Sequence, residues 1–439
     1  MLPVEAAAIW SLLAGYLLLP SNMNVDLPLL PPIDKMTVAA LSTFLLCWMK
    51  GTQTKPQRPP WLIYLFGLGY ILSPIFTSFT NSYELQTAAG SIPGFYPLDG
   101  LKIAGRQVIS LLPLFVGMRF LSSDRGRALL LKSLPTALTI YSLPMLLELR
   151  ISPQLHRIVY GYHPHEFQQQ VRAGGYRPVV FTEHGLALAL FVAMGLVAAL
   201  VLARLKWRIL RVPAGTIAAY LGALLILCKS LGSLIYGLLL TPVILFTRPR
   251  AWVKLGCALS LLVCAYPLLR WHGLVPVHFM ADAAANVSAD RSQSFNQRLH
   301  NEEQLLAKAN EKPLLGWGTW GRNRIYDRYT GRDISVTDGQ WIIQFGVFGW
   351  FGYLSLFGLL SAAMFGALRS VGYQTSSPAI IQAGLTLCLA VYLVDLIPNA
   401  NSMSLTLLLA GAVATSTRVR SARPSRLRKA AQAPVPAVS

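Results

Sequence analysis

Charged residues are scarce in this chain of 439 residues, and acidic residues are the scarcest. Charged residues make up 13% of the chain, with 18 Asp and Glu against 38 Lys and Arg, while 54% of residues are hydrophobic. The length alone would allow two or three soluble domains, but this composition excludes them. Apolar runs recur along the whole chain, which indicates a membrane protein that crosses the bilayer many times.

Cysteine is also rare, and no metal-binding pattern is present. The five cysteines fall in or beside apolar runs, and none forms a CxxC pair: Cys47, Cys228, Cys257, Cys264 and Cys388. They are typical of small buried hydrophobic residues and indicate no redox role. No closely spaced set of carboxylates resembles a Mg²⁺ site. We therefore expect no metal and no cofactor.

The apolar runs predict an all-α fold with about 12 transmembrane helices, since roughly 20 apolar residues span a bilayer and shorter runs suffice with interfacial anchors. The predicted spans are 4–20, 36–49, 61–80, 104–122, 128–148, 184–203, 213–228, 231–247, 252–269, 340–367, 379–397 and 401–416. Residues 1–269 thus hold nine spans, 270–339 form one large loop, and 340–416 hold the last three. The basic tail, 417–439, is expected to be disordered.

Lys and Arg are concentrated in alternate loops of this topology. The loops after the second, fourth, sixth and eighth spans and the C-terminal tail hold most of them, and only Glu5 and Asp124 are acids on that side. Positive loops mark the cytoplasmic side. We therefore expect a bacterial inner-membrane protein with both termini in the cytoplasm. The net charge of +20 is then a topology signal that also attracts anionic headgroups, and nucleic acid is not an expected partner.

The two long loops on the opposite, periplasmic side collect nearly every other acid and histidine. The loop at 149–183 ends in RAGGYRPVVFTEHG, which places Arg172, Arg177 and His184 directly before an apolar run. Arginines on this side run against the usual charge bias, and the two glycines between them permit close backbone approach. These three residues are therefore candidates for binding a ligand.

The loop at 270–339 is predicted to contain a helix followed by a turn. Residues 293–310 have the composition of a helix with a partial apolar face, and Pro313 ends it. GWGTWG then predicts a turn, and Asp338 precedes the tenth span. Both loops thus bring charged groups to the outer edge of the membrane.

The segment NEEQLLAKANEKPLLGWGTWG, followed by a polar loop and DGQWIIQFGVFGWFGYLSLFGLL, resembles the signature of the O-antigen polymerase and ligase superfamily. RAGGYRP before a mid-chain span resembles it too, and so does the layout with one large outer loop, so the resemblance covers most of the chain. It implies a glycosyltransferase that takes a glycan from undecaprenyl diphosphate and transfers it to a hydroxyl. The acceptor is another lipid-linked glycan, lipid A-core or a protein.

One position departs from the ligases of that family. They usually carry a histidine, often His-Asn, just before the span that follows the large loop, whereas this chain has Asp338-Gly339 there. The difference favours a polymerase of exopolysaccharide or O-antigen repeat units. A ligase is the alternative within the class, and a flippase of lipid-linked sugars is the alternative from another class. A flippase should place charges along its spans and show repeat symmetry, and neither pattern is present. Whether a chain-length regulator also binds stays open.

The expected reaction assigns tasks to particular side chains. A sugar on a lipid diphosphate has a good leaving group, so the enzyme must neutralise the developing diphosphate charge, and the planar arginine fork suits phosphate. A carboxylate or histidine suits activation of the acceptor hydroxyl in a single inverting displacement. We predict that Arg172 and Arg177 bind the diphosphate and that His184 and Asp338 act on the sugar or acceptor. The alternatives are interfacial anchoring for the arginines and helix capping for the other two.

A second set of residues in the large loop is predicted to contact the glycan or its phosphates. Its members are Arg291, Arg298, His300, Trp317, Arg322 and Arg324. Tryptophan rings can stack on sugars, although aromatic residues are common at membrane interfaces. Arg291 and Arg298 could instead cover a solvated face of the loop helix, and that is the expected place of Glu302 and Glu303.

Overall fold

The computed structural model of the protein describes residues 3–26, 32–51, 58–172, 174–277, 282, 289–401 and 404–415, leaving aside the side chains of 289–295. Across these ranges the chain is mostly helical, with 14 α-helices, and three short antiparallel hairpins lie in the connections. The prediction of a helical fold is confirmed. The hairpins are the departure from an all-α chain.

Each predicted span lies on a helix of the structure. These helices are α1 (Val4–Leu18), α2 (Lys35–Lys50), α3 (Trp61–Phe79), α4 (Pro97–Phe120), α5 (Asp124–Ile151), α7 (Gly185–Arg204), α8 (Ala214–Leu227), α9 (Leu231–Phe246), α10 (Pro249–Trp271), α13 (Gln340–Val371), α14 (Ser377–Asp395) and α15 (Ser404–Ala414). Seven of them (α3, α4, α5, α7, α10, α13 and α14) are long and apolar enough to cross a membrane, counting the described residues. By length and composition, this is a helical membrane protein. The number of twelve crossings stays a prediction.

The connections carry the remaining elements. They are β1 (Leu85–Thr87) paired with β2 (Gly90–Ile92), α6 (Leu155–Tyr160), the short 3₁₀ helix η1 (Phe167–Gln170), β3 (Val171–Arg172) paired with β4 (Gly175–Tyr176), β5 (Arg208–Ile209) paired with β6 (Val212–Pro213), and α12 (Ala289–Asn310). The expected helix at 293–310 is confirmed as the main part of α12. Its apolar residues Leu305, Leu306 and Ala309 are buried against the bundle.

Large apolar side chains face outward along the middle of several helices. Leu143 in α5 is 70% exposed, and Leu238 and Leu239 in α9 are each 64% exposed. Such a surface is unfavourable in water and suits the acyl chains of a bilayer. By contrast, α7 is buried along nearly its whole length among α5, α8, α9 and α14.

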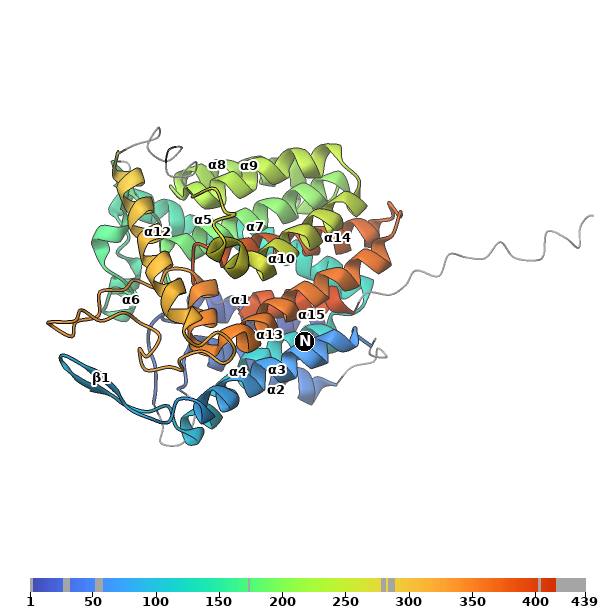
Figure 1. Ribbon diagram of the computed structural model, residues 1–439. Coiled ribbons are helices and arrows are strands. Elements are labelled where there is room, and N and C mark those ends of the chain that lie inside the picture. The colour runs from blue at the N-terminus through green and yellow to red at the C-terminus, as the bar shows by residue number, and fades with distance from the viewer. Residues whose placement is uncertain are drawn as a thin grey trace, which may run out of the picture.

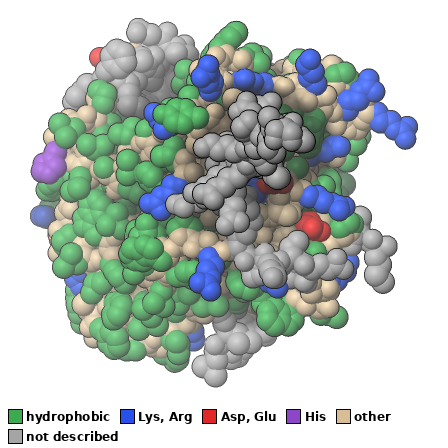
Figure 2. All heavy atoms as spheres, turned by 90° about the vertical axis from the view of Figure 1, so that its right-hand side faces the viewer, with side chains coloured by type: hydrophobic (Ala, Val, Ile, Leu, Met, Phe, Trp, Pro, Cys, Tyr) green, Lys and Arg blue, Asp and Glu red, His purple; other side chains and the backbone are tan. Residues whose placement is uncertain are grey.

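The connections gather at two ends of the bundle (Figure 1). One end carries α6, α12 and the hairpins β1–β2 and β3–β4, and we call it the α12 end. The opposite end carries short connections such as 121–123, 205–213 and 372–376. We call it the basic end, because Lys and Arg side chains outnumber acidic ones on the face shown in Figure 2. Which side of a membrane each end faces is a prediction from charge.

The tenth predicted span, 340–367, lies on α13, but α13 is not a continuous helix. Its backbone leaves the helical conformation at Gly349, where φ is +61°. Residues 313–318 exchange four backbone hydrogen bonds of 2.7–3.1 Å with residues 346–351 across this break. A side chain at Gly349 would collide with the Leu314 carbonyl. The predicted Gly/Trp turn therefore packs into a broken helix, which sequence periodicity does not reveal.

Candidate functional site

A buried carboxylate fixes the segment that carries Arg172 and Arg177. Glu148, near the end of α5, is fully buried and accepts hydrogen bonds from the N–H groups of Leu155 at 3.0 Å and of Val179 and Val180 at 2.8 Å. Val180 has φ +54°, a conformation that a β-branched residue adopts only under constraint. The three bonds tie the loop at 149–183 to the end of α5. The predicted loop is therefore folded against the bundle.

Arg177 and Lys229 join the β3–β4 hairpin to the turn between α8 and α9. The Nη2 of Arg177 donates to the Lys229 carbonyl at 3.0 Å, and the Nζ of Lys229 donates to the Arg172 carbonyl at 3.0 Å. Arg177 is only 6% exposed, and its aliphatic part lies against the first residue of α7, Gly185. Arg177 thus holds the hairpin in place, and its role in binding a ligand stays a prediction.

Arg172 differs from Arg177 in its exposure and in its bonding partners. It is exposed at the end of β3, opposite Gly175 in the hairpin register. No hydrogen bond or ion pair joins its guanidinium to any residue that the structure describes. Of the two arginines, Arg172 is the one whose planar fork is open to a ligand.

His184 caps α7. Its Nδ1 accepts a hydrogen bond from the Leu186 N–H at 3.0 Å, and its Nε2 faces the Gln169 Oε1 at 3.3 Å. Burial lowers the pKa of His184 to about 3, and the charge of Arg177, together with those of His165, Arg298 and Arg172, acts in the same direction. The imidazole is therefore neutral, with its proton on Nε2, and its single lone pair is used by the cap.

A capping role makes His184 replaceable by another cap residue. We expect His184→Asn, whose side-chain oxygen can accept the same N–H bond, to keep turnover of the reaction proposed for this site within roughly threefold of the wild type. His184→Ala should lower thermal stability, since it leaves the N–H of Leu186 without its acceptor. A large loss of turnover in His184→Asn, at unchanged stability, would instead assign the imidazole to the chemistry.

α12 carries a third arginine whose charge acts on the same region. The Nε of Arg298 lies 3.1 Å from Oδ2 of Asp338, and the two side chains are 40% and 34% exposed. The residue that caps α13 is Gly339, so the interpretation of Asp338 as a helix cap is wrong. Asp338 instead forms an ion pair across the start of α13.

Glu302 lies one helical turn beyond Arg298 and faces inward. Its side chain is 14% exposed, its Oε2 lies 3.9 Å from the Nε of Arg270 at the end of α10, and its Oε1 accepts a bond from the Trp341 indole at 3.4 Å. Burial raises the pKa of Glu302 to about 7, and the charge of Asp338 adds to the effect. The expectation of a solvated face holds for Glu303, which is exposed, and is wrong for Glu302.

Contacts and charges link five predicted residues at the α12 end: Arg298 pairs with Asp338, and the charges of the three arginines act on His184. We call this set the arginine cluster: Arg172, Arg177, His184, Arg298 and Asp338. The three arginines come from two loops far apart in the sequence, and their charges all act on His184, which begins α7. The N-terminus of α7 adds the positive end of a helix dipole. The region is therefore electropositive and suited to a phosphate-bearing ligand.

The other predicted contacts lie apart from the cluster. Trp317 is buried, its indole N–H donates to the Lys308 carbonyl, and Lys308 and Lys312 lie 3.6 Å and 4.6 Å from its ring centroid. In this conformation the ring is not open to a sugar, so the prediction of stacking has no support from the geometry. Arg322 is 1% exposed and donates to the carbonyls of Tyr83 and Pro93, so it clamps two connections together.

Three further predicted residues give no sign of a shared site. Arg324 pairs with Asp333 within the large loop. His300 is exposed on α12 and contacts Gln304 one turn along. Arg291 belongs to α12, but its side chain lies outside the described residues, and so does the predicted tail at 417–439.

Sequence reasoning missed four residues that build the region: Glu148, Lys229, Arg270 and Glu302. Glu148, Lys229 and Arg270 lie at the ends of apolar runs, where charged residues usually mark only the membrane boundary. A signal existed for the two acids: Glu148 is a rare acid at the end of a predicted span, and Glu302 shares a helix face with the apolar Leu305 and Leu306.

In the described part of the chain, no three His, Cys, Asp or Glu side chains gather in a way that could hold a metal ion. The charge at the α12 end that can meet an anionic ligand comes from arginine and lysine. In the comparisons with known proteins, no family model matches the chain and no curated protein matches it.

Proposed function

We propose that the protein is a membrane glycosyltransferase that polymerises lipid-diphosphate-linked oligosaccharide units at the α12 end. The observation that carries the proposal is the arginine cluster, in which the charges of three arginines, from the predicted loops at 149–183 and 270–339, act on His184 at the start of α7. Undecaprenyl diphosphate suits this position, because its chain would lie in the bilayer while its phosphates reach the cluster at the membrane edge. The resemblance to the O-antigen polymerase and ligase superfamily supports the same class of reaction.

The proposed task of the arginines is to stabilise the leaving group. As the bond between the anomeric carbon and the diphosphate oxygen breaks, negative charge grows on the diphosphate. Arg172, with its open guanidinium, binds these oxygens directly, and Arg177 supports it from the buried side. Arg298, which already pairs with Asp338, lies close enough to add its charge.

The proposed task of Glu302 is to accept the proton of the attacking hydroxyl. The acceptor oxygen forms a bond to the anomeric carbon in a single inverting displacement, and its proton passes to the Glu302 carboxylate. Partial burial beside Trp341 raises the pKa of this carboxyl to about 7, which is close to the optimum for a general base at neutral pH. His184 is unsuited to this task, because its lone pair caps α7.

The test of the proposal is polymerisation by the isolated protein. The purified chain, reconstituted in vesicles with an oligosaccharide on undecaprenyl diphosphate, should give a ladder of longer lipid-linked glycans and free undecaprenyl diphosphate. In cells without the gene, single repeat units on the carrier lipid should accumulate. Full-length unligated polymer would identify a ligase, and material trapped on the cytoplasmic side would identify a flippase.

A separate prediction concerns which end of the protein faces the periplasm. In a chain lacking its native cysteines, Gln168→Cys and Ala307→Cys, both exposed at the α12 end, should react with an impermeant maleimide in intact spheroplasts. Arg211→Cys, exposed at the basic end, should react only after lysis. The reverse pattern would place the arginine cluster in the cytoplasm and exclude a periplasmic polymerase.

Activity should also survive a chelator. Because arginines are proposed to neutralise the diphosphate, we expect purified enzyme to polymerise at its full rate in excess EDTA. The measurement compares ladder formation with and without EDTA, and with Mg²⁺ or Mn²⁺ added back. Activity that EDTA abolishes and one added ion restores would refute the arginine-only mechanism.

A further inference from the structure

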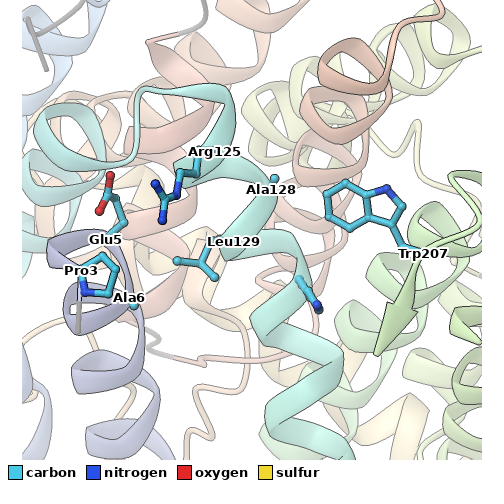
Figure 3. Close-up of a pocket in the computed structure, with 8 residues that line it drawn as sticks. Pro3, Glu5, Ala6, Arg125, Ala128, Leu129 and Trp207 are labelled. Carbon is cyan, nitrogen blue, oxygen red and sulfur yellow. The ribbon is translucent and has the colours of Figure 1, made fainter. Parts of the chain in front are cut away.

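A hollow of about 360 Å³ opens at the basic end, on the opposite side of the bundle from the arginine cluster. Figure 3 shows its walls: Glu5 on α1 and Arg125 on α5 lie on one side, and Trp207, in the connection between α7 and α8, lies on the other. Leu129, Ala6, Ala128 and Pro3, which precedes α1, form the rest of the lining that the figure labels. The hollow is thus apolar with charge at its rim.

Two cations line this hollow without a partner among the residues that the structure describes. No hydrogen bond or ion pair joins the side chain of Arg125 or Lys132 to another residue within the described ranges. The acid nearest in sequence, Asp124, is already paired with Arg127 at 2.7 Å. Only Glu5 offers a carboxylate in the lining, and no ion pair within the described residues includes it.

Other arginines at the basic end are occupied by contacts within the protein. Arg204 donates to two carbonyls, of Ile244 and Thr247, and lies over the ring of Trp252. Arg250 lies 3.5 Å from the ring centroid of Tyr373. The combination of two cations without described partners and a preformed hollow distinguishes Arg125 and Lys132 from these residues.

The spacing of the lining residues fits a molecule with a charged head and an apolar body. Arg125, Leu129 and Lys132 follow one another at four and three residues, so they share one face of α5. Lys132 lies about 10 Å further along the helix than Arg125. α5 is long and apolar enough to cross a membrane, and Trp207 is of the type that anchors at a membrane interface. The hollow therefore faces the level where phospholipid headgroups meet acyl chains.

We propose that this hollow binds one anionic phospholipid, with its phosphate held between Arg125 and Lys132 and an acyl chain along Leu129. The charge complementarity favours a lipid with a net negative headgroup over a zwitterionic one, whose own cation would meet Arg125 and Lys132. The site lies at the other end of the bundle from the proposed glycosyltransferase site and does not depend on that function.

The test uses the full chain, delipidated in detergent and titrated separately with phosphatidylglycerol, with phosphatidylcholine of the same acyl chains, and with inorganic phosphate. Bound lipid is counted by native mass spectrometry, and thermal stability is followed in parallel. The wild type should retain one phosphatidylglycerol and be stabilised by it. The double variant Arg125→Gln, Lys132→Gln should bind it more weakly by on the order of tenfold. The control pair Arg208→Gln, Arg211→Gln, exposed at the same end, should bind as the wild type does.

The outcomes that overturn the proposal are distinct. Equal weakening in both pairs would assign the binding to general surface charge, and equal retention of the two lipids would remove the role of the cations. Stabilisation by inorganic phosphate alone, with no preference for the lipid, would make the hollow a simple anion site. If the double variant does not fold, the single variant Lys132→Gln, monitored by size exclusion, gives the same comparison.

Discussion

Glu302→Gln should reduce the rate of glycan polymerisation by about 100-fold or more, because a positioned general base contributes at least that factor. Gln keeps the size of the side chain and still meets the Trp341 indole, but it cannot take a proton. The wild-type rate should fall as the pH drops below the pKa of Glu302, which burial raises to about 7, since only the carboxylate accepts a proton. This acid limb should be missing from the residual activity of the variant. The measurement is the rate of ladder formation between pH 5.5 and 9.

The control for Glu302 is its neighbour Glu303. Glu303 is exposed, so Glu303→Gln should polymerise at the wild-type rate with the wild-type pH profile. Whether the Glu302→Gln variant still folds is checked by comparing its thermal stability with that of the wild type at pH 8. Burial raises the pKa of Glu302 in the folded state, so its stabilising contribution is present in full at low pH and is lost as the pH rises through about 7. The neutral Gln variant should therefore be at least as stable as the wild type at pH 8. A Glu302→Gln enzyme with full activity would remove Glu302 from the mechanism.

Arg172→Lys should lower turnover by about tenfold or more, which corresponds to about 1.4 kcal/mol of transition-state stabilisation. Lysine keeps the charge but cannot bind two phosphate oxygens with one planar fork, whereas a cation that merely anchors at the interface tolerates the exchange. Because no described residue bonds to the Arg172 guanidinium, thermal stability should be unchanged. Turnover is measured with saturating lipid-linked substrate, so that binding and rate are separated.

Arg177→Lys tests the buried partner and should also lose most turnover. Its Nη2 holds the Lys229 carbonyl at 3.0 Å, so this variant should lose stability as well, which Arg172→Lys should not. The matched control is Arg208→Lys, an exposed arginine at the basic end, which should be silent in both measurements. If both Arg172→Lys and Arg177→Lys polymerise at the wild-type rate with normal expression, these arginines are membrane anchors and the site lies elsewhere.

The sequence alone determined where most helices of this protein lie, but not the three hairpins or the break in α13. Apolar runs located twelve of the described helices, all except α6 and α12, because the hydrophobicity needed for a membrane is a local property of about 20 residues. Composition and the Pro313 stop located α12, and the charge bias singled out Arg172 and Arg177. These conclusions depend on short stretches of sequence, in which local hydrophobicity, composition or charge is enough to predict the structure.

The tertiary structure decided which charged residues come together. Glu148 meets Val179 and Val180 from 31 and 32 residues away, and Glu302 meets Trp341 across 39 residues. Glu302 lies three and four residues before the buried Leu305 and Leu306, so helical spacing places it on the apolar face of α12, and the packing of α12 against α13 buries that face. The same holds for the break at Gly349, where the carbonyls of a distant loop replace helical hydrogen bonds. A carboxylate changes from a solvated charge to a candidate base when the chain removes water from it, and the helices that do so are distant in sequence.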